Sequence, residues 1–295
     1  MPWSFVLLAW ALGASSEGPT PGPVGARGSG WLQVVAHEDD DLLFMSPTLD
    51  DAIVRGDWPV TTVYLTAGDA GRNAAYWRSR EAGMRAAYAF MAGAPDVWEA
   101  DALDAAGARF FRFRLAAAPQ IALLFLRLPD ACDDTCPNGR ATDNMARLWR
   151  GSLGALATVD GTASYGREGL IAALTEVMAR YAPAHLSLLD CTGAHGHDHE
   201  DHHHSALFGL AAAARAGLHD VVLHRGYNIT GAPANLSAPE SMRKSAIFAT
   251  YLPHDAALCP NGPPCQPNAE YASWLERFYP LPGPFVAGDN VCVAP

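Results

Sequence analysis

Two clusters of histidine and carboxylate side chains are the part of this sequence best suited to chemistry. Residues 37–41, His-Glu-Asp-Asp-Asp, directly follow an apolar run that is typical of a short buried strand. Much later in the chain, the segment 195–204 holds six histidines and three carboxylates. Imidazole nitrogens and carboxylate oxygens are ligands that suit zinc. The two clusters therefore predict one divalent metal site built from distant parts of the chain.

Each cluster also has an interpretation without such a site. Consecutive carboxylates can form a solvated turn, but next to a buried strand their repulsion and desolvation call for a cation or strong donors. The histidine tract can be a low-complexity segment that sequesters ions. However, the tract is short and runs directly into the helix-forming stretch 205–214. At the start of that helix, His199 and His202 lie three residues apart and can share a face.

Apolar runs of strand length alternate with helical patterns from Trp31 onward. This alternation predicts an α/β fold, namely a single Rossmann-like, doubly wound domain whose mostly parallel sheet has helices on both faces. We expect strands at 32–36, 60–67, 109–116, 121–128, 186–189 and 221–224, and helices at 74–92, 140–151, 166–181, 203–216, 239–251 and 268–278.

Polar clusters follow five of the predicted strands at the point where each strand ends. Loops are polar in general, but open α/β sheets bind their ligands outside the carboxyl ends of the strands. We therefore expect the five clusters to converge on one rim of the sheet. They begin at His37, Gly68, Pro129, Asp190 and Arg225.

Charge excludes one class of partner. The chain has 20 basic and 31 acidic residues, a net charge of −11, and no basic stripe interrupts this balance. A surface that tracks a polyanion needs such a stripe. We therefore expect no nucleic-acid partner.

The first residues have the layout of a secretory signal. Residues 5–14 are apolar and are followed by a Pro/Gly-rich stretch. The apolar run is too short to span a bilayer, which needs roughly 20 apolar residues. We expect a signal peptide at 1–16, a linker at 17–30 and one domain at 31–295, in an exported protein without an integral membrane segment in its mature chain.

Six cysteines, an even number, fit an exported protein with disulfides. Two pairs lie close together in Pro/Gly/Asp-rich loops, where a local bridge could close, and the remaining two cysteines are a candidate long-range pair. Free buried thiols are the alternative. The three candidate pairs are Cys132 with Cys136, Cys259 with Cys265, and Cys191 with Cys292.

The two clusters resemble the motifs of a known family. Ala36 and residues 37–41 resemble the Ala-His-Pro-Asp-Asp-Glu signature of the LmbE-like/PIG-L family of zinc-dependent N-deacetylases, and residues 199–202 resemble its His-Pro-Asp-His element. The resemblance runs from about residue 32 to residue 228. Glu38 stands where the family commonly has Pro, and Asp41 where it has Glu. The extra histidines leave open whether His202 or His203 is the ligand.

The resemblance implies a role for each matched residue. Asp39 would be the general base, His199 would stabilise the tetrahedral oxyanion, and Asp201 would orient its neighbours. The physical chemistry agrees, because zinc lowers the pKa of its bound water towards ~7 and a nearby carboxylate can then take the proton. One zinc ion per chain is implied, with His37, Asp40 and His202 as its ligands.

The expected activity is hydrolysis. The resemblance implies removal of an N-acetyl group from an N-acetylglucosamine-type amino sugar in a glycoconjugate or polysaccharide, with release of acetate. Asp130, Arg72 and Arg80 are candidate substrate-binding residues, although Arg80 could equally form a salt bridge on its helix. An exported, non-catalytic metal- or sugar-binding protein and a zinc phosphoesterase are the alternatives. A phosphoesterase would usually want a cationic phosphate clamp or a second metal.

Overall fold

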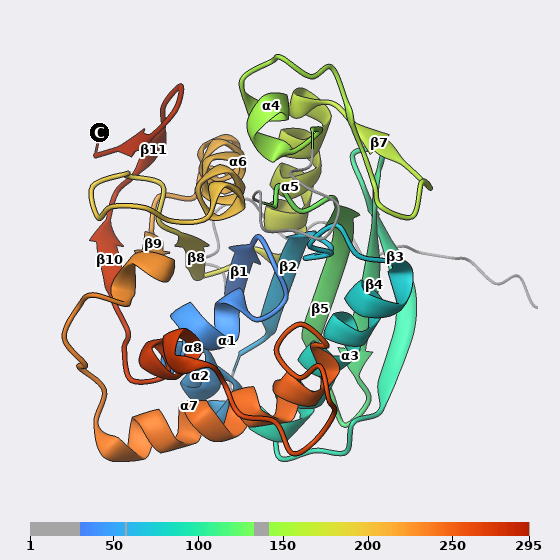
Figure 1. Cartoon of the computed structure of the whole chain (residues 1–295). Helices are drawn as coiled ribbons and strands as arrows, with labels where there is room; N and C mark the ends of the chain where they lie inside the picture. Colours follow the sequence, from blue (N-terminus) through green and yellow to red (C-terminus); the bar gives the residue numbers. More distant parts are fainter. Residues whose placement is uncertain (1–29, 57, 133–141, 295) are drawn as a thin grey trace, which may run out of the picture.

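The computed structural model describes residues 30–56, 58–132 and 142–294. An eight-stranded sheet lies at the centre of the molecule, in the order β10-β9-β8-β1-β2-β5-β4-β3 (Figure 1). Its strands are β1 (Trp31–Val35), β2 (Val60–Thr66), β3 (Trp98–Ala105), β4 (Ala108–Leu115), β5 (Ala118–Leu128), β8 (His185–Leu189), β9 (Val221–His224) and β10 (Pro280–Gly283). Four two-residue strands form two separate two-stranded ribbons among the described residues: β6 (Leu156–Ala157) pairs with β7 (Ser164–Tyr165), and β11 (Val286–Ala287) pairs with β12 (Cys292–Val293).

The five central strands of the sheet are parallel. β1 pairs in parallel with β2 on one side and with β8 on the other, and β5 and β9 extend this arrangement outward. The chain therefore runs from β1 through β2 to β5, and later returns to the other side of β1 to form β8 and β9. This reversal is the topological switch point at which open α/β sheets bind ligands.

Helices cover both faces of the sheet, as the sequence predicts (Figure 1). The buried strand side chains supply two apolar layers, one containing Phe44, Tyr88 and Trp274 and the other containing Leu188 and Phe208. The first layer packs against α1 (Asp40–Phe44), α2 (Thr48–Arg55), α3 (Ala74–Met91), α7 (Ala238–Tyr251) and α8 (Ala269–Trp274), and the second against α4 (Met145–Trp149), α5 (Arg167–Tyr181) and α6 (Glu200–Ala216).

The structure adds edge strands that the sequence patterns do not predict. β3 carries three acidic residues and lies at one edge, where it forms an antiparallel hairpin with β4. β10 contains two prolines and pairs antiparallel with β9 at the other edge. Proline is tolerated at the edge of a sheet because an edge strand needs fewer backbone donors.

Helix boundaries also differ from the expected ones. The helix expected at 140–151 is described as the five-residue α4, and residues 140 and 141 lie outside the described residues. α6 begins three residues earlier than expected, at Glu200, and the described α8 ends at Trp274. Short helices, α1 and α2, occupy residues 40–55, where no helix was expected.

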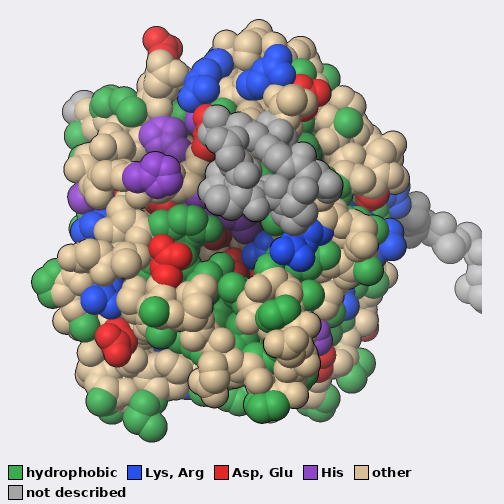
Figure 2. Space-filling view, viewed as in Figure 1, with side chains coloured by type: hydrophobic (Ala, Val, Ile, Leu, Met, Phe, Trp, Pro, Cys, Tyr) green, Lys and Arg blue, Asp and Glu red, His purple; other side chains and the backbone are tan. Residues whose placement is uncertain are grey.

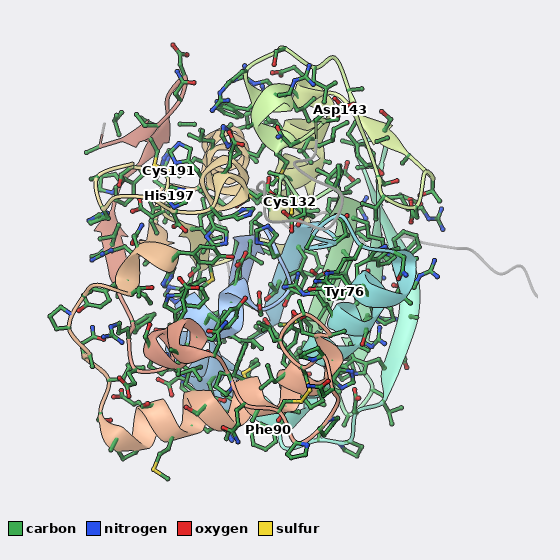
Figure 3. The ribbon with its side chains drawn as sticks, in the orientation of Figure 1. Tyr76, Phe90, Cys132, Asp143, Cys191 and His197 are labelled. Carbon is green, nitrogen blue, oxygen red and sulfur yellow. A yellow bond between two sulfur atoms is a disulfide. The ribbon has the colours of Figure 1, made fainter. Side chains whose placement is uncertain are left out.

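Two of the three candidate disulfides are confirmed. Cys191 is bonded to Cys292, and Cys259 to Cys265 (Figure 3). The third candidate pair includes Cys136, which lies outside the described residues, as do the expected signal peptide and all but the last residue of the linker. Among the described residues, no helix combines the length and the hydropathy that crossing a bilayer requires.

Candidate metal centre

The loops that follow three of the parallel strands, β8, β1 and β5, meet at the carboxyl edge of the sheet. His37 follows β1, Asp130 follows β5, and the second motif follows β8. The Nε2 atom of His37 lies 3.4 Å from Asp201 Oδ2 and 3.8 Å from Asp130 Oδ1. The expected convergence of these clusters on one rim is therefore what the structure shows.

The two predicted motifs contact each other directly. His202 Nε2 lies 2.9 Å from one carboxylate oxygen of Asp40, and His37 Nδ1 lies 3.4 Å from the other. One ring nitrogen from each of His37, His199 and His202 lies within 4.8 Å of the others, and the same limit holds for His37, Asp130, His199 and Asp201. We call these residues, with Asp40, the metal cluster.

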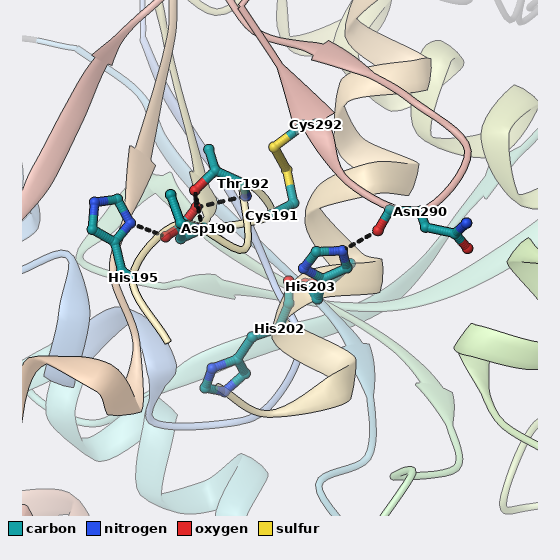
Figure 4. Close-up of a disulfide and its surroundings, with 10 residues drawn as sticks. Asp190, Cys191, Thr192, His195, His202, His203, Asn290 and Cys292 are labelled. Carbon is teal, nitrogen blue, oxygen red and sulfur yellow. Dashed lines mark hydrogen bonds and ion pairs between the residues drawn. A yellow bond between two sulfur atoms is a disulfide. The ribbon is translucent and has the colours of Figure 1, made fainter. Parts of the chain in front are cut away.

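The structure places His202 inside this cluster and His203 outside it. The His202 side chain is fully buried, whereas His203 bonds through Nε2 to the backbone oxygen of Asn290. Figure 4 shows the two rings pointing in different directions, with His203 turned toward Asn290. This placement favours His202 as the ligand.

Unpaired buried atoms show that these residues fit a metal ion. His202 Nε2 is close to Asp40 but has no hydrogen-bond partner in suitable geometry, and Asp201 Oδ1 is also buried without one. Leaving such atoms unsatisfied costs about 1–3 kcal/mol each. A cation that accepts nitrogen and oxygen lone pairs would satisfy them, and imidazole with carboxylate is a donor set used for zinc.

A carboxylate behind His202 fixes the orientation of its ring. Asp198 Oδ1 lies 2.8 Å from His202 Nδ1, so the other ring nitrogen faces Asp40. Such a partner fixes the tautomer of a metal-binding histidine. Burial alone would raise the pKa of Asp40, but His202 and His37 hold that pKa well below its usual range. The Asp40 carboxylate is thus anionic at neutral pH.

Asp39 has a strained backbone and one free carboxylate oxygen. Its φ angle is 95°, a region that Asp and Asn adopt more readily than most residues, and it precedes the first turn of α1. Arg80 donates a hydrogen bond of 3.1 Å to Asp39 Oδ1, while Oδ2 has no partner among the described residues. Burial raises the pKa of Asp39 to about 8, although Arg80 opposes the shift. The geometry suits a group that accepts a proton.

Arg80 is buried among protein partners on the inner face of α3. It donates hydrogen bonds to the backbone oxygens of Gly68 and Glu38 and to the hydroxyl of Tyr251. Its Nε lies 3.2 Å from Asp255 Oδ2. The guanidinium therefore holds the backbone next to Asp39. From the sequence, Arg80 is a candidate for a substrate contact or for a salt bridge on its helix, and its contacts in the structure are with protein groups.

The two positions that depart from the family motif are buried and make contacts outside the metal cluster. Glu38 lies with one carboxylate oxygen 3.9 Å from Arg80, and burial raises its pKa to about 8 although Arg80 lowers it. Asp41 accepts a hydrogen bond of 2.8 Å from the Tyr64 hydroxyl and another from Tyr88. Both side chains therefore belong to the packing behind the metal cluster.

The other two candidate substrate residues lie at different depths. Asp130 is buried, and its Oδ1 lies 3.7 Å from His199 Nε2, so it faces the metal cluster. Arg72 is exposed, and its guanidinium lies 4.9 Å from the ring centre of Tyr76, which is labelled in Figure 3. It lines an open pocket of about 630 Å³ together with Asn73 and Ser79.

Residues 32–213 match the model of a protein family described as PIG-L: GlcNAc-PI de-N-acetylase. The chain belongs to this family. The resemblance of the two motifs is thereby confirmed, and the match covers β1 to most of α6. No curated protein sequence matches the chain.

Solved structures give weaker likenesses. A deacetylase of teicoplanin biosynthesis is 13% identical with a TM-score of 0.47, over 77% of this chain and 85% of that one. N,N'-diacetylchitobiose deacetylase from Pyrococcus horikoshii is 12% identical with a TM-score of 0.42, over 76% and 70%. A 4-carboxy-2-hydroxymuconate hydratase from Pseudomonas putida KT2440 is 14% identical with a TM-score of 0.41, over 75% and 78%. At these values none of them informs on the chemistry of this PIG-L family member.

Two residues beside the PIG-L motifs, Asp198 and Tyr227, have no role assigned to them from the sequence. Asp198 holds His202 and also accepts hydrogen bonds from the backbone nitrogens of His199 and Tyr227. Its position four residues before His202 on the chain was the available signal, since such pairs can meet on one helix face. Tyr227 lies beyond the PIG-L match, in the polar cluster that begins at Arg225, and its ring centre lies 4.8 Å from that of His202.

The C-terminal residues clamp the loop that carries the second motif. The Cys191–Cys292 disulfide joins the start of this loop to β12 (Figure 4). The Trp149 indole donates a 2.7 Å hydrogen bond to the backbone oxygen of Asp289. Asp190 binds His195 within the same loop at 2.7 Å. Figure 2 shows histidine side chains gathered at the surface over this loop and the start of α6. The second motif of the PIG-L site is therefore held from outside as well as from the sheet.

Proposed function

We propose that this chain is a metal-dependent hydrolase that removes the N-acetyl group from an amino sugar and releases acetate and the free amine. The observation that carries the proposal is the free Oδ2 atom of buried Asp39 beside a cluster of histidines and carboxylates. Membership of the PIG-L family supports the reaction class and the amino-sugar substrate. The proposed substrate is N-acetylglucosamine within a glycoconjugate or polysaccharide. We propose that the protein is exported.

His37, Asp40 and His202 would hold one zinc ion. When bound, the ion would polarise the amide carbonyl and lower the pKa of a water molecule. Asp39 is placed to take the proton of the attacking water, because one of its oxygens is fixed by Arg80 and the other is free. His199, which lines the cluster 3.7 Å from Asp130, is placed to stabilise the charge that develops on the carbonyl oxygen.

The reaction balances with these groups alone. The water oxygen forms a bond to the carbonyl carbon while its proton passes to Asp39. The carbon–nitrogen bond then breaks, and the proton held by Asp39 goes to the leaving nitrogen. The second proton of the water stays on the carboxyl group that forms and is released to solvent at neutral pH, so that acetate and a free amino sugar result. Asp130 and Arg72 are proposed to contact the sugar, Asp130 from inside the cluster and Arg72 from the open pocket beside Tyr76.

Acetate release from N-acetylglucosamine-bearing substrates by metal-replete protein tests the proposal. Asp39→Asn should retain metal and lose at least about a hundredfold in kcat, in line with the loss of a general base. Asp101→Asn is the matched control, since Asp101 forms part-exposed ion pairs with Arg112 and Arg114 on the edge hairpin of the sheet. Equal activity of Asp39→Asn and wild type would reject the base assignment.

The alternatives predict other results. A zinc phosphoesterase would cleave phosphoesters and release no acetate, and its metal content would approach two ions per chain. A non-catalytic metal-binding protein would take up several weakly bound ions on the histidine tract and leave every acetylated substrate intact.

A further inference from the structure

Aromatic side chains from the C-terminal part of the chain form one wall beside the metal cluster. Tyr227, in the short helix η1 (Tyr227–Ile229), lies edge-on to His202 and His199, with ring centres 4.8 and 5.9 Å apart. Its ring stacks on Trp274 at 4.7 Å with an interplanar angle of 12°, and Tyr271 lies 4.6 Å from the same indole. We call Tyr227, Tyr271 and Trp274 the aromatic wall.

The aromatic wall is rigid behind Tyr227. Trp274 is 1% exposed, and its indole nitrogen donates a 2.7 Å hydrogen bond to Thr230. The backbone nitrogen of Tyr227 donates a 3.0 Å hydrogen bond to Asp198, the carboxylate that also holds the His202 ring. The preceding Gly226 leaves no room for a Cβ, which would lie 2.7 Å from His202 Nδ1. The position of Tyr227 is therefore tied to that of a proposed metal ligand.

The hydroxyl groups of Tyr227 and Tyr271 differ in their hydrogen bonding from those of other tyrosines near the site. The hydroxyls of Tyr64, Tyr76 and Tyr251 donate to buried carboxylates. Within the part of the chain that the structure describes, the hydroxyls of Tyr227 and Tyr271 have no hydrogen-bond partner, and both residues are half-buried rather than sealed in the core.

The surroundings place the phenol of Tyr227 within the electrostatic field of the site. Burial raises the pKa of Tyr227 well above its usual range, and the neighbouring Tyr271, Asp40 and Asp39 raise it further. Phenylalanine would make the same ring contacts but would present no hydroxyl toward the site. The Tyr227 hydroxyl has no hydrogen-bond partner among the described residues, so it is free to bond with water or with a bound ligand.

We propose that Tyr227 contacts the substrate, with its hydroxyl hydrogen-bonded to the acylamino group bound at the metal cluster, and that Tyr271 adds a second hydroxyl to the same wall. A phenol is protonated at neutral pH and can donate to the carbonyl oxygen or accept from the amide N–H. The inference rests on the proposed function. It goes beyond the family match, because both tyrosines lie after residue 213, where that match ends.

Tyr227→Phe tests the inference, because it removes only the hydroxyl. Metal content and thermal unfolding should equal those of the wild type, while kcat/KM for acetate release should fall roughly tenfold, the loss of one hydrogen bond to substrate. Tyr271→Phe should give a smaller fall. Tyr165→Phe is the matched control, since this buried tyrosine lies in the apolar layer on the other face of the sheet.

A binding measurement without turnover separates the inference from the proposed function. In the Asp39→Asn background, calorimetric titration with N-acetylglucosamine should show roughly tenfold weaker binding once Tyr227→Phe is added. A wild type that releases no acetate would count against the proposed function, and this titration then decides the role of Tyr227. Values of kcat/KM and of the dissociation constant within twofold of the parent protein would overturn the inference.

Discussion

Gly68→Ala should disable the site without touching any proposed metal ligand. Gly68 lies two residues after β2 with a φ angle of +49°. A Cβ added there would lie 2.2 Å from Arg80 Nη1 and 2.4 Å from Glu38 Oε2. Because real Cβ atoms do not approach other atoms so closely, the guanidinium must move. Arg80 is the group that holds Asp39 Oδ1 at 3.1 Å, so its displacement reaches the proposed base.

The magnitude has two parts. An L-residue in the left-handed region costs about 1–2 kcal/mol relative to glycine. Forcing a methyl group into a filled site costs about 1–3 kcal/mol more. We therefore expect the free energy of unfolding to fall by about 2–5 kcal/mol. A misplaced catalytic group can cost on the order of a hundredfold in rate, so kcat should fall strongly in the protein that remains folded.

Gly161→Ala is the matched control for this experiment. Gly161 has a similar φ of +68°, but an added Cβ would meet nothing within 4 Å. The Gly161→Ala variant should therefore lose only the free energy of unfolding that the left-handed backbone conformation costs an alanine, and it should retain full activity. The assay is urea unfolding of both variants and the wild type, with acetate release and metal content measured on the same samples. Equal unfolding free energies and equal kcat for the two variants would refute the role given to Arg80.

Two further predictions concern His202 and a buried lysine. Asp198→Asn should weaken zinc binding about 10- to 100-fold, measured by competition with a chelator, because it alters the partner that orients His202; unchanged affinity would contradict this role. Burial lowers the pKa of Lys244 to about 7, so between about pH 7 and its ordinary value near 10.5 the unfolded chain binds a proton that the folded chain does not. Unfolding free energy should therefore rise with pH across this interval, and Lys244→Met should lack that rise in urea titrations.

The sequence predicts the convergence of the site because two physical rules act together. Apolar runs identify the buried parallel strands, and the carboxyl-end rule then brings His37, Asp130 and the second motif to one rim. The edge strands β3 and β10 lack such runs, because an exposed edge does not require them. Their positions follow only from the assembled sheet.

The finer placement of the second motif depends on geometry that residue types do not encode. α6 begins at Glu200 because His199 caps it, with the His199 side chain accepting a hydrogen bond from Asp201 N. Histidine is not a usual capping residue, so the pattern predicts a later start. Once the helix begins there, His202 turns inward and His203 outward. Arg80 is a similar case, since only the packing of α3 shows that its guanidinium faces the backbone of the first motif.

The Cys191–Cys292 disulfide also sets an order of events in biosynthesis. Its two cysteines are 101 residues apart, so the clamp cannot close until the C-terminal part of the chain has emerged from the ribosome and met an oxidant. The strand β1 and the first motif are made much earlier, since His37 precedes Cys292 by 255 residues. The loop bearing His199 is thus the last part of the site to be secured, and a nascent chain carries the first motif well before its metal-binding partner is locked in place.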